Sequence, residues 1–214
     1  YAYSFAKYNL GQMHLTENYE LPNGQSMNDC GRAPLALGAL TIGATGQEMS
    51  SAYATFANKG VYRQGRTYTK VYNSQGKLII DNTQVSEQIL SEKTVDYVNY
   101  CLDKAVEYGT GTVADFKGMN ICGKTGTTNS KKDRYFCGYT GYYTAAVWCG
   151  FEVNNNNKPT GTHIKGHGSE DNYVQYIPLH FLVNGAQEPR YASIRFYRTD
   201  MDVERVMRVK QSGR

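Results

Sequence analysis

Apolar residues recur at helical spacing in three parts of the chain. The clearest part is residues 91–109, where the apolar side chains are three or four residues apart: Val95, Val98, Leu102 and Val106. Residues 45–60 predict a second helix, because Thr45 and Glu48 have the spacing of a capping box and a glycine ends the pattern. Residues 1–15 indicate a third helix. Each of these helices has one apolar face to bury.

Other segments predict strands. Residues 66–72 and 77–80 alternate in polarity around an Asn-Ser-Gln-Gly turn, which is typical of a β-hairpin. Beyond residue 120 the chain is rich in Tyr, Thr, Val and Cys, and short turns separate three predicted strands: 120–128, 134–142 and 144–151. A weaker pattern indicates a strand at 191–198. The sequence therefore predicts an α/β fold of the α+β kind, an antiparallel sheet flanked by helices.

The composition divides the chain in two. Its 214 residues suit one domain of ordinary size, with or without a small addition. Four consecutive asparagines follow residue 153, and six of the ten arginines lie from Arg190 onward. We therefore separate residues 1–152 from a tail of unassigned type, residues 153–214. The net charge of +4 is too small to indicate nucleic-acid binding. No apolar run approaches the roughly 20 residues that span a bilayer.

We expect neither a metal nor a cofactor. Five cysteines are an odd number and lack the paired spacing of zinc sites. His163 and His167 lie four residues apart, with Glu170 and Asp171 nearby, but the glycines around them disfavour the helix that would bring them together. We interpret this segment as a loop with ordinary histidines.

Two functional patterns overlap at one place in the chain. Gly118 to Thr125 fits the phosphate-loop pattern G-x-x-x-x-G-K-[ST]. That loop requires a helix directly after the lysine, whose N-terminus helps to bind the phosphates. The residues that follow here predict strands instead, so the nucleotide-binding interpretation is disfavoured. The alternative is Lys-Thr-Gly, the third signature of penicillin-binding proteins and serine β-lactamases.

The second pattern gives each residue a chemical role on a strand at the edge of a sheet. Lys124 is the catalytic candidate, a cation that attracts a substrate carboxylate and favours proton loss from nearby hydroxyls. Thr125 and Thr127 share one face and can donate hydroxyl hydrogen bonds. Gly126 lets a substrate backbone lie close to the strand. The N–H of Thr127 is suited to stabilise an oxyanion. We name Lys124, Thr125, Gly126 and Thr127 as the substrate-binding residues.

The surroundings of this strand resemble the transpeptidase domain of penicillin-binding proteins, especially the bifunctional class A type. Four blocks occur in the order of that family. The blocks are Leu35-Ala36-Leu37-Gly38-Ala39-Leu40-Thr41-Ile42-Gly43-Ala44-Thr45 with residues 48–60, Gly109-Thr110-Gly111-Thr112, Asp133-Arg134-Tyr135-Phe136-Cys137-Gly138-Tyr139-Thr140, and Ala146-Val147-Trp148-Cys149-Gly150. The resemblance covers about residues 1–152.

This resemblance implies a peptidoglycan D,D-transpeptidase that works through a serine acyl-enzyme. The implied partners are peptidoglycan stem peptides, β-lactams and the remainder of the chain's own transpeptidase domain. The implied location is the extracytoplasmic face of a bacterial membrane, with an anchor outside these residues. Two alternatives stay open: a β-lactamase or β-lactam sensor of the same fold, and a non-catalytic remnant or binding module.

The family also requires Ser-x-x-Lys, which carries the nucleophile, and Ser-x-Asn, which helps to move its proton. Three pairs have one of these spacings: Ser4 with Lys7, Ser74 with Lys77, and Ser26 with Asn28. The first lies too near the Leu35 block, the second in a hairpin turn and the third in a loop. We interpret all three as accidental. We therefore expect the chain to be the C-terminal part of a transpeptidase domain, inactive when isolated.

Overall fold

A four-stranded sheet forms the centre of the protein. In the computed structural model, the residues described are 1–115, 119–128, 133–150 and 194–197. The strand order is β10-β9-β8-β7, with bounds Cys122–Thr127 for β7, Asp133–Tyr139 for β8, Thr144–Gly150 for β9 and Ile194–Tyr197 for β10. The first three strands in sequence pair antiparallel, and β10 runs parallel to β9. The predicted α+β class and all four of these strands are confirmed.

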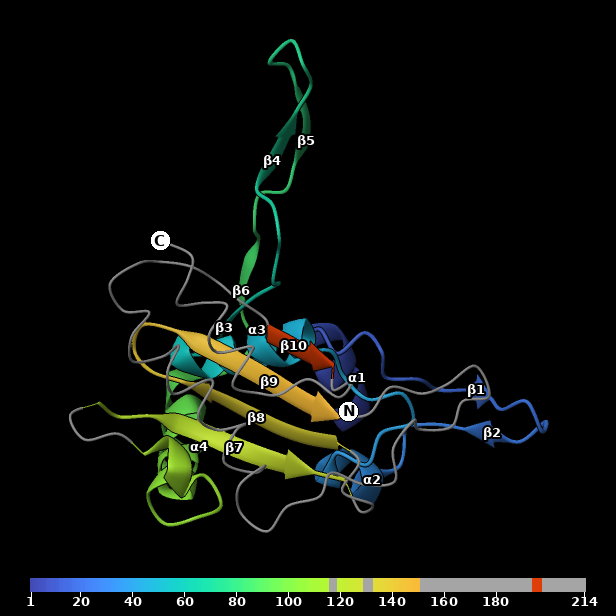
Figure 1. The fold of residues 1–214 in the computed structure, drawn as a ribbon, viewed down its shortest axis with the longest axis vertical. Helices are drawn as coiled ribbons and strands as arrows, with labels where there is room; N and C mark the ends of the chain where they lie inside the picture. The colour runs from blue at the N-terminus through green and yellow to red at the C-terminus, as the bar shows by residue number, and fades with distance from the viewer. Residues whose placement is uncertain (116–118, 129–132, 151–193, 198–214) are drawn as a thin grey trace.

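Helix α3 (Gly46–Ala57) packs on one face of this sheet (Figure 1). Its predicted capping box is confirmed, since Thr45 Oγ1 accepts the backbone N–H of Glu48 and the Glu48 carboxylate accepts the N–H of Thr45 at 2.8 Å. The Tyr53 ring lies edge-on to the Tyr139 ring, with centroids 6.4 Å apart. Local capping and aromatic packing thus fix α3 against β8 and β9.

Helix α4 (Glu92–Glu107) begins after Ser91, whose hydroxyl accepts the N–H of Thr94. Its predicted apolar stripe is confirmed at Val95 and Val106, which are both buried. Figure 1 places this helix behind β7. A short 3₁₀ turn, Thr112–Ala114, follows it. One buried cluster joins these parts to the sheet: Val106, Ala114, Ile121, Phe136, Ala145 and Val147.

The N-terminal helix is shorter than predicted. Helix α1 (Ala2–Ser4) continues as a π-helical turn, Phe5–Asn9, and the chain then leaves helical geometry. The expected helix over residues 1–15 is therefore wrong beyond Asn9. The physical reason is a tertiary contact, because Leu15 folds back to be buried and its carbonyl accepts the hydroxyl of buried Tyr3 at 3.2 Å. Tyr8, in the π-helical turn, is exposed.

The next segment holds two short strands and a short helix: β1 (Tyr19–Glu20), β2 (Ser26–Met27) and α2 (Arg32–Leu37). Buried Asp29 ties this segment together. Its two carboxylate oxygens accept the backbone N–H groups of Thr16, at 2.9 Å, and Thr41, at 2.7 Å. Charge-assisted hydrogen bonds of this kind replace the water that a buried carboxylate loses.

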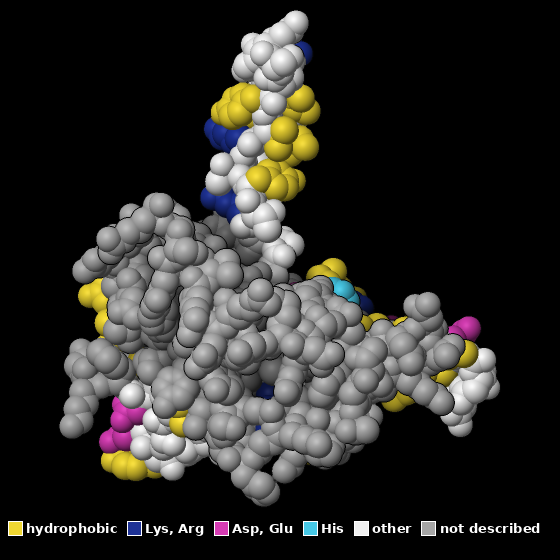
Figure 2. Space-filling model, viewed as in Figure 1, with side chains coloured by type: hydrophobic (Ala, Val, Ile, Leu, Met, Phe, Trp, Pro, Cys, Tyr) yellow, Lys and Arg dark blue, Asp and Glu magenta, His cyan; other side chains and the backbone are white. Residues whose placement is uncertain are grey.

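A long two-stranded ribbon, residues 61–88, projects from the body of the protein (Figure 1). We call it the arm. Its base pairs β3 (Val61–Arg63) with β6 (Ser86–Gln88), and its outer part pairs β4 (Lys70–Tyr72) with β5 (Leu78–Asp81). The predicted hairpin is confirmed, though its first strand begins at Lys70. Figure 2 shows hydrophobic and basic side chains exposed along the arm.

Candidate functional site

The Lys-Thr-Gly strand lies at the edge of the sheet, within the part of the chain that the structure describes. Thr128 donates its backbone N–H to the carbonyl of Asp133 in β8, at 3.1 Å. Successive residues of an antiparallel strand direct their backbone groups to opposite sides. The N–H groups of Thr127 and Thr125 therefore point away from β8, toward the edge. This is the orientation that an oxyanion donor at Thr127 needs.

The ammonium group of Lys124 lies at the same edge. Its side chain is exposed, and Nζ donates to the backbone carbonyl oxygen of Thr125 at 3.0 Å. The Thr125 hydroxyl oxygen is 3.5 Å from Nζ. Lys124 and Thr125 alternate between faces of the strand, so the lysine side chain bends around the edge to reach its neighbour. A cation and a hydroxyl are thereby held side by side.

A second hydroxyl belongs to this cluster, from a residue that the sequence analysis placed in a family block but did not name as a site residue. Thr110 Oγ1 lies 2.5 Å from Thr125 Oγ1. Its two glycine neighbours explain the position, because they pack against the last turn of α4. An added Cβ would lie 2.7 Å from the Ala105 carbonyl oxygen at Gly109 and 3.1 Å from it at Gly111. The Gly-Thr-Gly pattern in the sequence could have predicted this position of Thr110, since a glycine on each side of a threonine indicates close backbone packing.

The turn after β7 is fixed by a second set of polar contacts. Asp133 donates its N–H to Thr128 Oγ1 at 3.1 Å, and its carboxylate accepts the indole N–H of Trp148 at 3.1 Å. Trp148 lies in β9, so the two bonds together link the residue after β7 to β8 and β9. These bonds hold the end of β7 in register with β8. They preserve the alignment of Thr127 with the sheet edge.

The ring of Phe136 lies directly over Gly123 in β7 and Gly138 in β8. An added Cβ would lie 2.7 Å from the Phe136 ring at Gly123 and also at Gly138. Both positions therefore require the absence of a side chain. Gly123 directly precedes Lys124, so the contact with the Phe136 ring also helps to fix the backbone position of Lys124.

The structure contradicts the phosphate-loop pattern. Lys124 and Thr125 lie inside a strand that pairs with β8, whereas the phosphate loop needs them at the start of a helix. Residues Cys122 to Thr125 of this pattern therefore form part of the Lys-Thr-Gly strand and not a phosphate loop. Gly118 itself lies outside the described residues.

The three serine pairs lie in unsuitable surroundings. Lys7 Nζ donates to the Leu15 carbonyl at 2.7 Å and to the Tyr3 hydroxyl at 3.2 Å. The hydrogen bond with Tyr3 raises the pKa of Lys7, which is the wrong direction for a lysine that must accept a serine proton. Ser74 and Lys77 lie at the outer turn of the arm.

The remaining pair, Ser26 and Asn28, belongs to the exposed segment around β2. The group of His163, His167, Glu170 and Asp171 lies outside the described residues. Within those residues, no cluster of three or more metal-ligating side chains occurs. No helix among them is both long enough and apolar enough to cross a bilayer.

Comparison with known proteins agrees with the geometry of the sheet. The profile of the penicillin binding protein transpeptidase domain matches residues 4–172. Penicillin-binding protein 1A of Clostridium acetobutylicum is 38% identical over 130 residues, which are 60% of this chain and 15% of that protein. Penicillin-binding protein 4 of Bacillus subtilis is 40% identical over 117 residues, 55% of this chain and 19% of that protein. The chain thus spans less than a fifth of these relatives.

Solved structures agree on the fold. PonA1 of Mycobacterium tuberculosis, in complex with penicillin V, aligns with a TM-score of 0.57 and 22% identity, covering 86% of this chain and 50% of that one. Penicillin-binding protein 1A of Haemophilus influenzae gives 0.51 and 20%, covering 75% and 29%. The chain belongs to the penicillin-binding protein transpeptidase family.

The division at residue 152 stays a prediction. The family match continues to residue 172. Strand β10, from within the expected tail, pairs with β9 in register from Ile194 opposite Val147 to Tyr197 opposite Gly150. Both observations concern residues of the predicted tail, 153–214.

Proposed function

We propose that this chain supplies the substrate-carboxylate side of a peptidoglycan D,D-transpeptidase that works through a serine acyl-enzyme. The observation that carries the proposal is the edge of β7, where the Lys124 ammonium lies 3.5 Å from the Thr125 hydroxyl and the N–H of Thr127 points outward along the same strand. This set matches a peptide that ends in a free carboxylate. The family membership gives the reaction class.

Each group has one step in the proposed reaction. Lys124 and Thr125 bind the C-terminal carboxylate of a D-alanyl-D-alanine peptide, and Thr110 orients the Thr125 hydroxyl through their contact. When the serine oxygen attacks the penultimate carbonyl, the oxygen of that carbonyl becomes negative. The N–H of Thr127 stabilises this charge. The terminal D-alanine leaves, and an amine of a neighbouring peptide takes the acyl group.

The nucleophile of this reaction must come from another part of the transpeptidase domain. Lys7 Nζ donates to the Tyr3 hydroxyl and the Leu15 carbonyl, and the contact with Tyr3 raises the pKa of Lys7, which disfavours Lys7 as the base for Ser4. The proposed partners are therefore the rest of that domain, peptidoglycan stem peptides and β-lactams. The proposed location is the extracytoplasmic face of the bacterial membrane.

The proposal can be tested in a transpeptidase domain that contains this segment together with the Ser-x-x-Lys and Ser-x-Asn motifs. The measurement is the rate at which fluorescent penicillin acylates that domain. Lys124→Ala is expected to slow acylation by about 10- to 100-fold, because a charge-assisted hydrogen bond contributes roughly 1.5–3 kcal/mol. Lys77→Ala, a matched change at the outer turn of the arm, should leave the rate unchanged. Equal rates for wild type and Lys124→Ala would contradict the role of Lys124.

The isolated chain provides a second test. It should form no stable adduct with fluorescent penicillin. An adduct mapped to Ser4 would contradict our assignment and restore the Ser4–Lys7 pair. Rapid nitrocefin turnover by the complete protein would favour a β-lactamase over a transpeptidase.

A further inference from the structure

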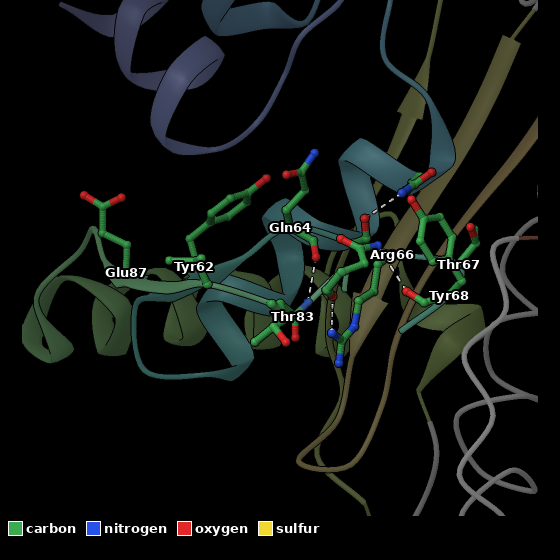
Figure 3. A pocket seen from close by; sticks show the side chains of 12 residues that line it. Tyr62, Gln64, Arg66, Thr67, Tyr68, Thr83 and Glu87 are labelled. Atoms are coloured by element: carbon green, nitrogen blue, oxygen red, sulfur yellow. Dashed lines mark hydrogen bonds between the residues drawn. The ribbon is translucent and has the colours of Figure 1, made fainter. Parts of the chain in front are cut away.

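The arm contains a cavity where its two strands separate. The ladder of β3 with β6 ends at Arg63 and Ser86, and the ladder of β4 with β5 begins at Lys70 and Asp81. Between them, the two segments of the arm and the first turn of α3 line a cavity of about 400 Å³ that is open to solvent on one side (Figure 3). An interruption at the middle of a ribbon exposes backbone groups that the ladder would otherwise pair.

Side-chain hydrogen bonds hold the cavity open by satisfying those backbone groups. Gln47 Nε2 donates to the Gly65 carbonyl at 2.8 Å, and Gln84 Nε2 donates to the Gln64 carbonyl at 2.6 Å. Arg66 Nη1 donates to the Asn82 carbonyl at 2.6 Å. These bonds run across the cavity walls from both strands and from α3. The frame is therefore built before any ligand binds, which lowers the entropy lost on binding.

The groups that remain for a ligand are neutral amides, hydroxyls and aromatic rings. The primary amides of the frame donate through nitrogen, so their oxygens are directed elsewhere as acceptors. Thr67 adds a hydroxyl, and Thr83 adds a hydroxyl oxygen as an acceptor, because its proton is donated to Asp81 at 2.6 Å. The Tyr68 ring, 46% exposed, offers an apolar face (Figure 3). This combination suits a saccharide, whose hydroxyls need hydrogen bonds and whose C–H face packs on a ring.

The charges of the cavity exclude other ligand classes. Arg66 is the basic residue of the lining and Glu87 is the acidic one, and the Arg66 guanidinium already binds a carbonyl. A polyphosphate would meet one cation and one anion, which is poor electrostatic complementarity. A large apolar ligand would leave the amides without partners. An uncharged or singly charged ligand with amide groups fits best.

We propose that this cavity binds the N-acetylated sugar units of the glycan strand that carries the stem peptide. The identity of the saccharide rests on the proposed transpeptidase function, while its chemical class rests on the cavity itself. An acetamido N–H can donate to the lining amide oxygens, and its carbonyl can accept from the Thr67 hydroxyl. The arm then guides the polymer, while the edge of β7 binds its peptide.

The test is a titration of the complete 214-residue chain with chitotetraose, followed by ¹H–¹⁵N NMR. We expect shifts at residues 62–68 and 82–87, and at least fivefold weaker binding in Tyr68→Ala. Tyr68→Phe keeps the ring and should bind within twofold of wild type. Tyr72→Ala is the matched control, because Tyr72 is 56% exposed on the same arm but does not line the cavity.

Three outcomes would overturn the proposal. The first is no shift on the arm at 10 times the concentration that half-saturates a standard chitin-binding lectin. The second is equal weakening by Tyr68→Ala and Tyr72→Ala, which would place binding on the outer apolar surface. The third is equal affinity for maltotetraose, which lacks acetamido groups. If chitotetraose binds but penicillin acylation fails, the saccharide site stands and only its assignment to peptidoglycan falls.

Discussion

Strands β7 to β9 of the sheet and the strands of the arm are all antiparallel and rich in aromatic and β-branched residues, yet their side chains have opposite surroundings. In β8, Phe136 is fully buried. In β5, Ile79 is 61% exposed. The sheet is covered by α3 and joined to α4 through a shared core, whereas the arm projects away from both helices (Figure 1). Alternation therefore predicts a strand, and only the neighbouring elements decide whether it contributes to the core.

The largest expected effect is on the sheet. Phe136→Ala should lower the free energy of unfolding by about 3–5 kcal/mol, because it removes a buried ring from the cluster that includes Val106 and Val147. Urea denaturation followed by circular dichroism measures this change. Tyr97→Ala, which removes an exposed ring from α4, is the control and should change stability by under about 0.5 kcal/mol. Similar losses in both variants would contradict the assigned core.

The sequence was most informative where the determining contacts are local. The capping box at Thr45, the cap at Ser91 and the turn at Asn73 each depend on residues three or four positions apart. Their side chains bond to the adjacent backbone, so a short window contains the whole interaction. For the same reason the helices after Thr45 and Ser91 began where predicted.

Contacts between distant segments were missed. The burial of Leu15 under Tyr3 ended the first helix early, and the carboxylate of Asp29 joins two loops on either side of it. Thr110 reaches Thr125 across 15 residues. The periodicity of apolar residues reports local structure only and cannot predict contacts between segments that are distant in the sequence. The candidate residues Lys124 to Thr127 were found because they form one contiguous motif, and their roles stay predictions.

A smaller effect is expected on the capping of α3, which covers the sheet. Burial acts to raise the pKa of Glu48, but hydrogen bonds from the Thr45 backbone, His14 and the Thr45 hydroxyl outweigh it and lower the pKa. A lowered pKa stabilises the fold above the ordinary glutamate value of 4.5, and this stability is lost as the pH falls through the folded pKa. Glu48→Gln keeps a capping residue but does not titrate.

Urea midpoints between pH 7 and pH 3 measure that contribution. Glu48→Gln should cost about 1 kcal/mol at pH 7 and show a weaker loss of stability on acidification than wild type. The control is Glu92→Gln in the first turn of α4, where the carboxylate is exposed and 3.8 Å from Lys59. It should keep the wild-type pH dependence. A Glu48→Gln variant with the full wild-type pH dependence would refute this account.

The smallest effect is expected on the arm, and it tests the comparison most directly. Ile79→Ser replaces an apolar side chain with a polar one in β5, a change that costs several kcal/mol in a core strand. Because Ile79 is exposed, we expect the free energy of unfolding to change by less than about 0.5 kcal/mol. Val147→Ser in β9 is the buried counterpart and should be severely destabilising. Comparable losses in the two variants would mean that the side chains of the arm are packed as tightly as those of the sheet. A difference in burial would then no longer distinguish the two regions.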